Sequence, residues 1–425
     1  MTEPRRVTDR LRAYVPQVPL SERDLRWARV RKLMATQDID AVLFFGNDIY
    51  WGMGMANLRY MFQVDSQIGA HALLLPDGDP VIWNAPPHMS RPTNMYLALQ
   101  DWVSDFRPAL GPAAMVHEIV SRAPGARRIG YVGFSNAVQP SSVLAADLNA
   151  MTAGLPNATF VDLTQAMQAM RLVKSEVEID LLRQASKISR LTVDAMVHAC
   201  GQPGATEASV FAEMIRTQIA NGAEPNIFNL MASGPVDHPE DEIWHLLHGC
   251  EQPLAPTMRP LDAGDIMIAE WHTKFGGYRC HSEYTVYLGK TPPDPLKRIW
   301  DVTLECFDAS KSALVAGHTI REAYEMIERP AIRAGLQWVE LGFHAMGTAS
   351  PEFPTVVYPL PIMESFFPGI GDFVLEEGMC FGNNIDLHDP AWRTDVGCMY
   401  SDFMVVRPGA AECLVGMPRE MGSAF

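Results

Sequence analysis

The stretch AGDIMIAEWHTKFGGYRCHSEYTVYLG, residues 263–289, decides the fold of the second half of this chain. Two largely apolar runs flank the pair Gly276–Gly277, a pattern typical of antiparallel strands joined by a tight turn. Side chains two positions apart on a strand point to the same face, so His281 and Glu283 share one face of this predicted hairpin. Titratable side chains on one face of an apolar hairpin are the first candidates for chemistry.

Helices and further strands surround this hairpin. An apolar stripe at helical spacing predicts a long helix over residues 171–199. Two more predicted helices, each closed by a glycine, cover residues 294–317 and 319–335. From residue 370 onward the chain is rich in strand patterns. This order of elements indicates an α+β second domain.

The first part of the chain alternates helix and strand. Residues 21–38 have helical spacing behind a serine cap, and residues 41–46 and 127–134 form continuous apolar runs typical of buried strands. This alternation predicts a compact α/β domain. Because 425 residues are too many for one ordinary domain, we predict two, residues 1–165 and 166–425.

Composition narrows the class of protein. Hydrophobic residues make up 48% of the chain, enough for two cores, and the formal net charge is −16. A strongly negative charge disfavours nucleic acid and anionic membranes as partners. The N-terminal residues lack the apolar core of a signal peptide, and no long uncharged run exists elsewhere. We therefore expect a cytoplasmic protein that acts on a small molecule.

Four stretches, in order, resemble the pita-bread family of creatinases, prolidases, aminopeptidases P and methionine aminopeptidases. They are RLVKSEVEIDLLRQASKIS (171–189), the hairpin of 263–289, GFHAMGTASPEFP (342–354), and LEEGMCFGNNI (375–385) followed by YSDFMVVRPGAAECL (400–414). With the α/β first part, the resemblance covers nearly the whole chain. It implies a creatinase-type α/β domain followed by a pita-bread catalytic domain. It also implies a homodimer in which the partner's N-terminal domain borders the active site.

The metal-using members of the family bind two ions through Asp, Asp, His, Glu and Glu. Carried over residue by residue, these positions fall in this chain on Glu270, His281, His344, Asn384 and Ser401. Two adjacent divalent ions need bridging carboxylates, which Asn384 and Ser401 do not supply. We therefore expect no metal ligands and no cofactor. A single first-row ion held by Glu270, His281 and His344 is the open alternative.

The creatinase branch of the family also lacks these ligands and hydrolyses a C–N bond with protein groups alone. It places a glutamate two residues after the lost second Asp, which is Glu283 here. It also uses a histidine from the loop before the Gly-Asp strand. In this chain that loop includes DHPEDEIWHLLHG (237–249), where His248 is the first candidate and His245 the second. The expected catalytic residues are therefore Glu283, His248, His245, His281 and His344.

Six residues are expected to shape the substrate pocket. Glu270, Asn384 and Ser401 stand in the vacated metal site, and Glu352 matches a family position near the substrate, although it could equally cap a loop. Trp271 and Tyr278 are candidates for an aromatic contact with a cationic group, with core packing as the alternative. By contrast, His272 is given no role, and Asp386 is expected in a solvated loop.

Substrate and reaction follow from the same resemblance. Creatinase grips its substrate carboxylate with arginines, but residues 334–392 contain neither Arg nor Lys, so creatine itself is not expected. The main hypothesis is a creatinase-like, metal-independent hydrolase that cleaves a non-peptide C–N bond by Glu/His acid–base chemistry. The alternatives are a metal-dependent hydrolase like the Xaa-Pro peptidases, a pita-bread lyase of the dimethylsulfoniopropionate-cleaving type, and a non-catalytic binding protein.

Overall fold

The computed structural model describes residues 12–47, 54–66, 69–85, 100–108, 111–133, 143–225, 229–237 and 256–424. The chain divides into two compact units, Met1–Arg171 and Leu172–Phe425. The boundary predicted from the sequence, between residues 165 and 166, falls inside the helix α7 (Thr164–Leu172).

The first unit is built on one mixed sheet with the strand order β4-β3-β2-β1-β5-β6. The central strand β1 pairs antiparallel with β2 and parallel with β5. The strands are β1 (Ala41–Gly46), β2 (Ala70–Leu74), β3 (Val81–Ala85), β4 (Asp105–Pro108), β5 (Arg128–Val132) and β6 (Thr159–Asp162). The helices described in this unit, besides α7, are α2 (Leu20–Thr36), α3 (Ala56–Phe62), α5 (Pro112–Arg122) and α6 (Ala145–Gly154).

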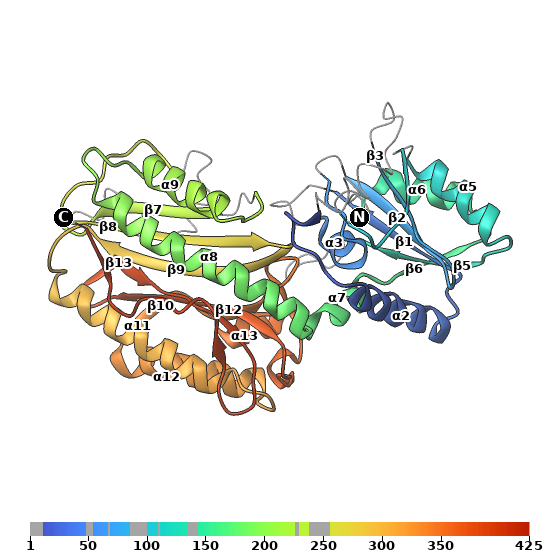
Figure 1. Ribbon diagram of the computed structural model, residues 1–425. Helices are drawn as coiled ribbons and strands as arrows, with labels where there is room; N and C mark the ends of the chain where they lie inside the picture. The colour runs from blue at the N-terminus through green and yellow to red at the C-terminus, as the bar shows by residue number, and fades with distance from the viewer. Residues whose placement is uncertain are drawn as a thin grey trace, which may run out of the picture. The chain divides into compact units, whose positions relative to one another are not determined.

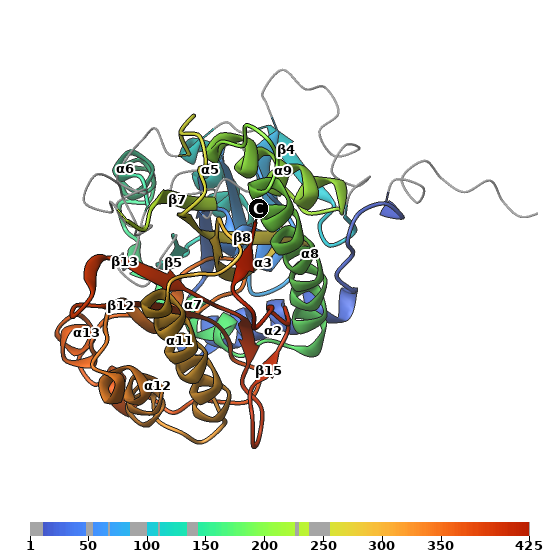
Figure 2. The same ribbon diagram turned by 90° about the vertical axis from the view of Figure 1, so that its left-hand side faces the viewer.

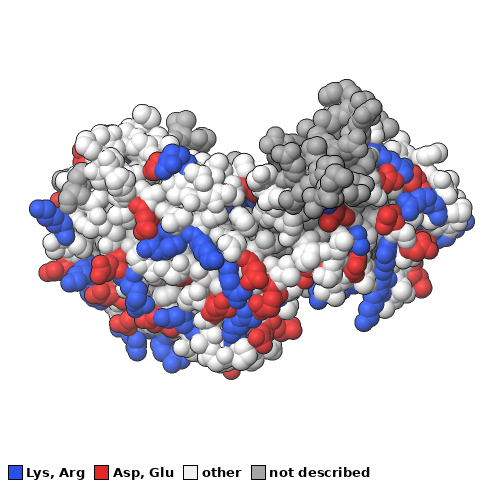
Figure 3. Space-filling view, viewed as in Figure 1, with Lys and Arg blue, Asp and Glu red and all other residues white. Residues whose placement is uncertain are grey.

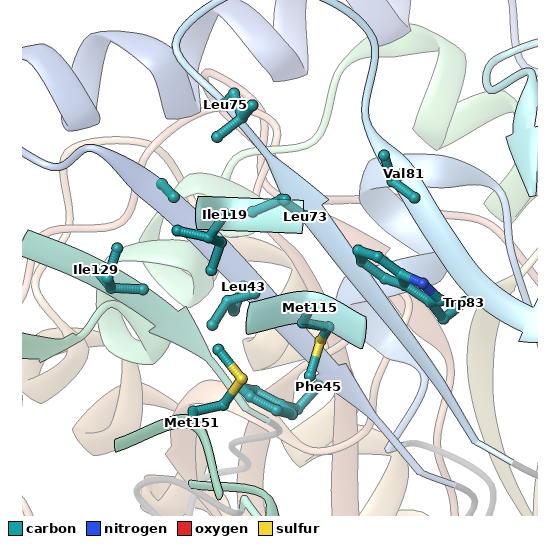
Figure 4. Close-up of a cluster of buried hydrophobic side chains, with 11 residues drawn as sticks. Leu43, Phe45, Leu73, Leu75, Val81, Trp83, Met115, Ile119, Ile129 and Met151 are labelled. Carbon is teal, nitrogen blue, oxygen red and sulfur yellow. The ribbon is translucent and has the colours of Figure 1, made fainter. Parts of the chain in front are cut away.

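The core of this unit forms where strand β1 meets the helices α5 and α6. Every residue of β1 is buried, as expected for a strand covered on both faces. Leu43 and Phe45, two positions apart, join Met115 and Ile119 of α5 and Met151 of α6 in one apolar cluster, which Figure 4 shows. The alternation of α and β predicted for this part of the chain therefore produces an apolar core on the side of the sheet where α5 and α6 pack.

The second unit contains two sheets. One has the order β16-β9-β8-β7 and the other β11-β10-β12-β14-β15, with β13 paired to β12. The strands of the first are β7 (Asn229–Pro235), β8 (Asp265–Phe275), β9 (Tyr278–Tyr287) and β16 (Gly422–Ser423). Those of the second are β10 (Gln337–Ala345), β11 (Glu352–Val356), β12 (Cys380–Asp389), β13 (Arg393–Met399), β14 (Phe403–Val405) and β15 (Glu412–Cys413). The predicted hairpin is present as β8 and β9, with a continuous antiparallel register.

Helices cover the outer faces of both sheets, so the unit has four layers (Figures 1 and 2). The helices α8 (Glu176–Cys200) and α9 (Glu207–Ala220) pack on β7, β8 and β9. On the other side, α11 (Asp294–Ala313) and α12 (Ile320–Ala334) pack on β10, β12 and β13. A short helix, α13 (Leu360–Phe366), follows β11. The two sheets contact each other through β9, β12 and β13, so their inner faces enclose the centre of the unit.

The helix starts of this unit are set by local sequence. Three helices begin with a capping box, in which a Ser or Thr accepts from the backbone of the third helical residue and that residue's side chain bonds back. The pairs are Ser175 with Glu178 for α8, Thr206 with Ser209 for α9, and Thr319 with Glu322 for α12. Gly335 then ends α12 in the left-handed conformation, at φ 71°.

Charges of both signs are interspersed on the face of the second unit that Figure 3 shows. The net charge of −16 is therefore not gathered into one acidic patch on this face. Among the described residues, no helix has both the length and the hydropathy needed to cross a bilayer.

Asp402 fixes the path of the chain after the last long strands. Its carboxylate is buried and accepts four backbone hydrogen bonds, from the N–H groups of Phe403, Val415, Gly416 and Met417, at 2.7–3.0 Å. Its own N–H donates to Asn383 Oδ1 at 2.9 Å. One side chain thus satisfies donors from two segments and ties the chain around residue 416 to β14.

We expect Asp402→Ala to destabilise the protein by at least about 3 kcal/mol, because four buried N–H groups lose their acceptor. Asp402→Asn, which keeps one acceptor oxygen, should fall between wild type and Asp402→Ala. The matched control is Asp372→Ala, whose side chain is 83% exposed. Urea unfolding measures the three differences. A loss for Asp402→Ala no larger than that of the control would contradict this account.

Candidate active site

The candidate site lies between the two sheets of the second unit. In the β8–β9 register, Glu270 is opposite Glu283 and His272 is opposite His281, so four polar side chains share the inner face of the hairpin. The register between β10 and β12 places Gly342 opposite Asn384 and His344 opposite Gly382. Period-two alternation in four strands thus directs one polar group after another into the same space.

Glu270, His272 and His281 form a tight triangle. Glu270 Oε1 lies 3.3 Å from His281 Nδ1 and 3.5 Å from His272 Nε2, and the two nitrogens are 3.3 Å apart. Both imidazoles are buried. Burial raises the pKa of Glu270, but the contacts with His272 and His281 outweigh this effect and hold the pKa below its usual range. Glu270 is therefore an ionised carboxylate in the folded protein.

His281 fits this position because Gly382 has no side chain. A Cβ built on Gly382 would lie 2.6 Å from His281 Cβ and 2.7 Å from His281 Cγ. The imidazole therefore occupies space that any other residue at 382 would fill. On its far side, the ring meets His344 edge to face, with ring centroids 5.0 Å apart. Burial first, and then the neighbouring His281 and His272, lower the pKa of His344 to about 3, so His344 is neutral at physiological pH.

Glu283 lies at the other end of the cluster, among carboxyl groups. Its side chain is fully buried, with Oε1 3.5 Å from His281 Nε2. Asn384 Nδ2 donates to Glu283 Oε1 at 2.9 Å and to Glu340 Oε2 at 3.0 Å. Burial raises the pKa of Glu283 well above its usual range, and neighbouring carboxyl groups, Asp386 first, raise it further. We conclude that Glu283 retains a proton under conditions where an exposed glutamate is ionised.

Asp386 and Ser401 complete the surroundings of Glu283. Burial, then the charge of Glu270, raises the pKa of Asp386 well above its usual range, while the nearby His281 and a hydrogen bond with Glu283 act in the opposite direction. Ser401 contacts the same residue through the backbone, since its N–H donates to the Glu283 carbonyl oxygen at 3.1 Å. Its hydroxyl donates to the carbonyl of Asp402 at 3.4 Å.

Three predicted pocket residues are not brought to this cluster. Trp271 lies on the opposite face of β8 and donates from Nε1 to Ser189 Oγ of α8 at 2.8 Å. Tyr278 also contacts α8, donating to Glu178 Oε1 at 2.9 Å. Glu352 forms a buried ion pair with Lys174, at 3.2 Å. Their contacts favour packing and capping, the alternatives considered for them, over contact with a substrate.

Two predicted catalytic residues, His245 and His248, lie outside the described residues. The structure therefore brings together Glu270, His281, Glu283, His344, Asn384 and Ser401 from the predicted set.

Three residues of the cluster were missed from the sequence. Asp386 does not lie in a solvated loop, because β12 continues to Asp389 and is buried throughout. His272 shares its face with Glu270, and a period-two reading of β8 would have found it. Glu340 precedes the histidine turn and carries no distinguishing pattern. The sequence signal for Asp386 was the alternation Gly382, Asn384, Asp386, which continues the strand by two residues.

The residues present do not fit the two-ion centre implied by the resemblance. Asn384, which the resemblance places at a carboxylate ligand position, donates from its amide nitrogen to two carboxyl groups. At another, the Ser401 hydroxyl is engaged by a backbone carbonyl. Two adjacent cations would lack the bridging carboxylates that offset their mutual repulsion. Among the described residues, one group of three side chains has the spacing of ligands for an ion: Glu270, His272 and His281.

Comparison with known proteins assigns the family. A model described as "Metallopeptidase family M24" matches residues 180–408, and one described as "Creatinase/Prolidase N-terminal domain" matches residues 26–173. The chain belongs to metallopeptidase family M24. The predicted order, a creatinase-type α/β domain followed by a pita-bread domain, is confirmed.

Among similar M24 proteins, a probable dipeptidase PepE from Mycobacterium bovis is 27% identical over 263 residues, 61% of this chain and 62% of that protein. An Xaa-Pro dipeptidase from Lactobacillus helveticus is 24% identical over 264 residues, 60% of this chain and 64% of that protein. Both matches span less than two thirds of the relative. An Xaa-Pro dipeptidase structure from Bacillus anthracis superimposes with a TM-score of 0.72 at 18% identity, covering 94% of this chain and 99% of that one. The structural likeness shows a shared fold.

Buried neutral histidines make this M24 protein less stable as the pH falls. Burial lowers the pKa of His344 to about 3 and that of His272 to about 4, whereas an unfolded histidine titrates near about 6.5. As pH falls below about 6.5, these histidines bind protons in the unfolded state but not in the folded state. The free energy of unfolding therefore decreases by about 1 kcal/mol per pH unit for each group. In chelator-treated protein, we expect His344→Gln to show a shallower loss between about pH 7 and about pH 5.

Urea unfolding at several pH values measures these slopes, which do not depend on the absolute stability of the variant. His198→Gln, an exposed histidine of α8, is the control and should keep the wild-type slope. Equal slopes for His344→Gln and wild type would show that His344 is not held neutral by the fold.

Proposed function

We propose that this M24 protein is a hydrolase that cleaves a non-peptide C–N bond of a small molecule, in the manner of creatinase, without a pair of metal ions. The observation that carries the proposal is the position of Glu283, a fully buried carboxyl group among other carboxyl groups, where burial raises its pKa well above the usual range. It belongs to a cluster in which the residues that would bridge two ions are replaced by an amide and a hydroxyl.

A protonated carboxyl group near neutral pH is suited to general acid catalysis. Breaking a C–N bond expels a poorly leaving amine nitrogen unless that nitrogen receives a proton as the bond breaks. Glu283 would supply this proton, and Asn384 would hold the carboxyl in place through Oε1. The base that takes the proton of the attacking water would return it to the resulting carboxylate, so the cycle closes without net change in the protein.

The histidines of the cluster have different parts in this scheme. His344, with a pKa of about 3, is too weak a base to remove a proton from water and acts as a neutral hydrogen-bonding group. His281, 3.5 Å from Glu283 Oε1 through Nε2, positions the acid. The base that the creatinase resemblance supplies would come from His245 or His248.

Charge indicates the class of substrate. Four carboxyl groups surround the cluster, and no Arg or Lys occurs in residues 334–392. A carboxylate on the substrate would be repelled by the ionised Glu270, and residues 334–392 offer neither Arg nor Lys to pair with it. The pocket therefore favours a neutral or cationic small molecule over creatine. The homodimer implied by the family resemblance and the cytoplasmic location expected from the sequence remain part of this proposal.

A second candidate function is a metal-dependent dipeptidase. It is favoured by the names of the similar M24 proteins, which are dipeptidases, and by the ion-like spacing of Glu270, His272 and His281. Xaa-Pro dipeptides and small non-peptide amides therefore belong in the same assay.

We expect the full-length protein to release amine from at least one neutral or cationic amide, urea or cyclic amidine, with labelled oxygen from water in the product. Glu283→Gln should reduce kcat by about a hundredfold or more, because the amide cannot donate an acidic proton. Glu305→Gln, an exposed position on α11, is the control and should match wild type. Mass spectrometry of the products gives both readouts.

Three outcomes would contradict the proposal. Undiminished turnover by Glu283→Gln would remove Glu283 as the acid. Products without label from water would indicate elimination, as in a lyase. Turnover of Xaa-Pro dipeptides alone, dependent on added metal, would favour the dipeptidase.

A further inference from the structure

We propose that Glu270, His272 and His281 bind a single first-row transition-metal ion, through one carboxylate oxygen and two imidazole nitrogens. The inference rests on the proposed function only in taking this cavity as the reaction site. It adds a ligand, His272, at a position outside the family's five ligand positions.

The distances among the three ligand atoms support a common bound ion. Glu270 Oε1, His281 Nδ1 and His272 Nε2 form a near-equilateral triangle with edges of 3.3, 3.5 and 3.3 Å. A point about 2 Å from each of these atoms exists close to the plane of such a triangle, and about 2 Å is the usual bond length from zinc to nitrogen or carboxylate oxygen. Larger or uneven edges would leave at least one ligand out of reach.

Hydrogen bonds alone are a poor explanation of the triangle. Each N–H can point at one acceptor, yet every corner of the triangle faces the other two. The three contacts, at 3.3–3.5 Å, are also longer than the usual N–H···O distance of about 2.9 Å. One cation at the centre satisfies all three lone pairs together.

The other ring nitrogen of His281 has the partner expected for a metal ligand. Nε2 is buried and makes no hydrogen bond within the described part of the chain, but it lies 3.5 Å from Glu283 Oε1. Histidines that bind a metal through one nitrogen commonly direct the other at a carboxylate, which fixes the tautomer. Binding through Nδ1 would place the N–H on Nε2, facing Glu283. The same side chain is fixed in position against Gly382.

The chemistry of the donor set selects the kind of ion. Two imidazoles and one carboxylate suit Mn, Fe, Co, Ni or Zn, whereas Mg²⁺ and Ca²⁺ prefer oxygen ligands throughout. One carboxylate, Glu270, lies within 3.5 Å of both nitrogens, so it would offset part of the charge of a divalent ion. The ligands also lie on two fully paired strands, a rigid support for a metal site.

The test measures binding, not turnover. Full-length protein is stripped with chelator and titrated with Co²⁺ and Zn²⁺. We expect about one ion per chain, with visible absorption from bound Co²⁺. His272→Ala should weaken binding by about a hundredfold or more, whereas the exposed control His198→Ala should bind as wild type does. X-ray absorption of the Zn-loaded wild type should count two imidazoles, which keeps the test valid if His272→Ala fails to fold.

Failure of this inference differs from failure of the proposed function. Absence of binding by the stripped wild type, unchanged binding by His272→Ala, or fewer than two imidazoles around zinc would each overturn it. If no metal bound, loss of turnover in Glu283→Gln would still support the proposed hydrolase. In the same way, one bound ion in a protein that cleaves no amide would support the site and remove the hydrolase.

Discussion

The site depends on one close approach, the packing of the His281 ring against the bare backbone of Gly382. Two sheets must approach each other closely enough to exclude water, yet leave room for an imidazole between them. Because position 382 carries no Cβ, the ring enters between β9 and β12 without forcing the sheets apart. From there it contacts Glu270, Glu283 and His344 at once. A larger residue at 382 would separate the two halves of the cluster.

Burial then decides how the charges of the cluster are compensated. At one end, Glu270 stays ionised because two imidazoles stabilise its negative charge. At the other end, burial and the neighbouring carboxyl groups raise the pKa of Glu283 and of Asp386 well above their usual ranges, so the protonated forms are favoured there. His281 connects the two ends, with Nδ1 toward Glu270 and Nε2 toward Glu283. Protonation therefore compensates the carboxyl groups at the Glu283 end of the cavity. At the Glu270 end, the proposed single cation would do so.

Much of the fold could be predicted from sequence because its signals are local. The capping boxes of α8, α9 and α12, the glycine turn of the hairpin and the alternation in β8 and β9 each involve residues close in the chain. The assignment of inner and outer faces was harder, because it depends on which sheet face a helix covers. The aromatic rings of Trp271 and Tyr278 are of a kind that could line a substrate pocket. Their polar atoms, however, donate hydrogen bonds to α8.

The site was less predictable than the fold for a related reason. Glu352 meets Lys174, which is 178 residues away in the chain, and no periodicity reveals such a pair. Glu340 enters the site only because Asn384 bridges it to Glu283 across two strands. His272 was overlooked because isolated histidines are more often structural than functional. Its meaning comes from the register that sets it opposite His281.

The same scaffold can support different chemistry because strand alternation fixes where a side chain points, not what it carries. In this chain the inner positions of β8 and β9 carry two carboxylates and two imidazoles, and those of β12 carry glycine, asparagine and aspartate. Exchanging one carboxylate for an amide turns an acceptor into a donor, which here holds two carboxyl groups together instead of a cation. Exchanging another carboxylate for an imidazole replaces oxygen ligand atoms with a nitrogen ligand atom. The same geometry can thus present different side chains on a shared fold, and for that reason membership of M24 alone does not identify the substrate.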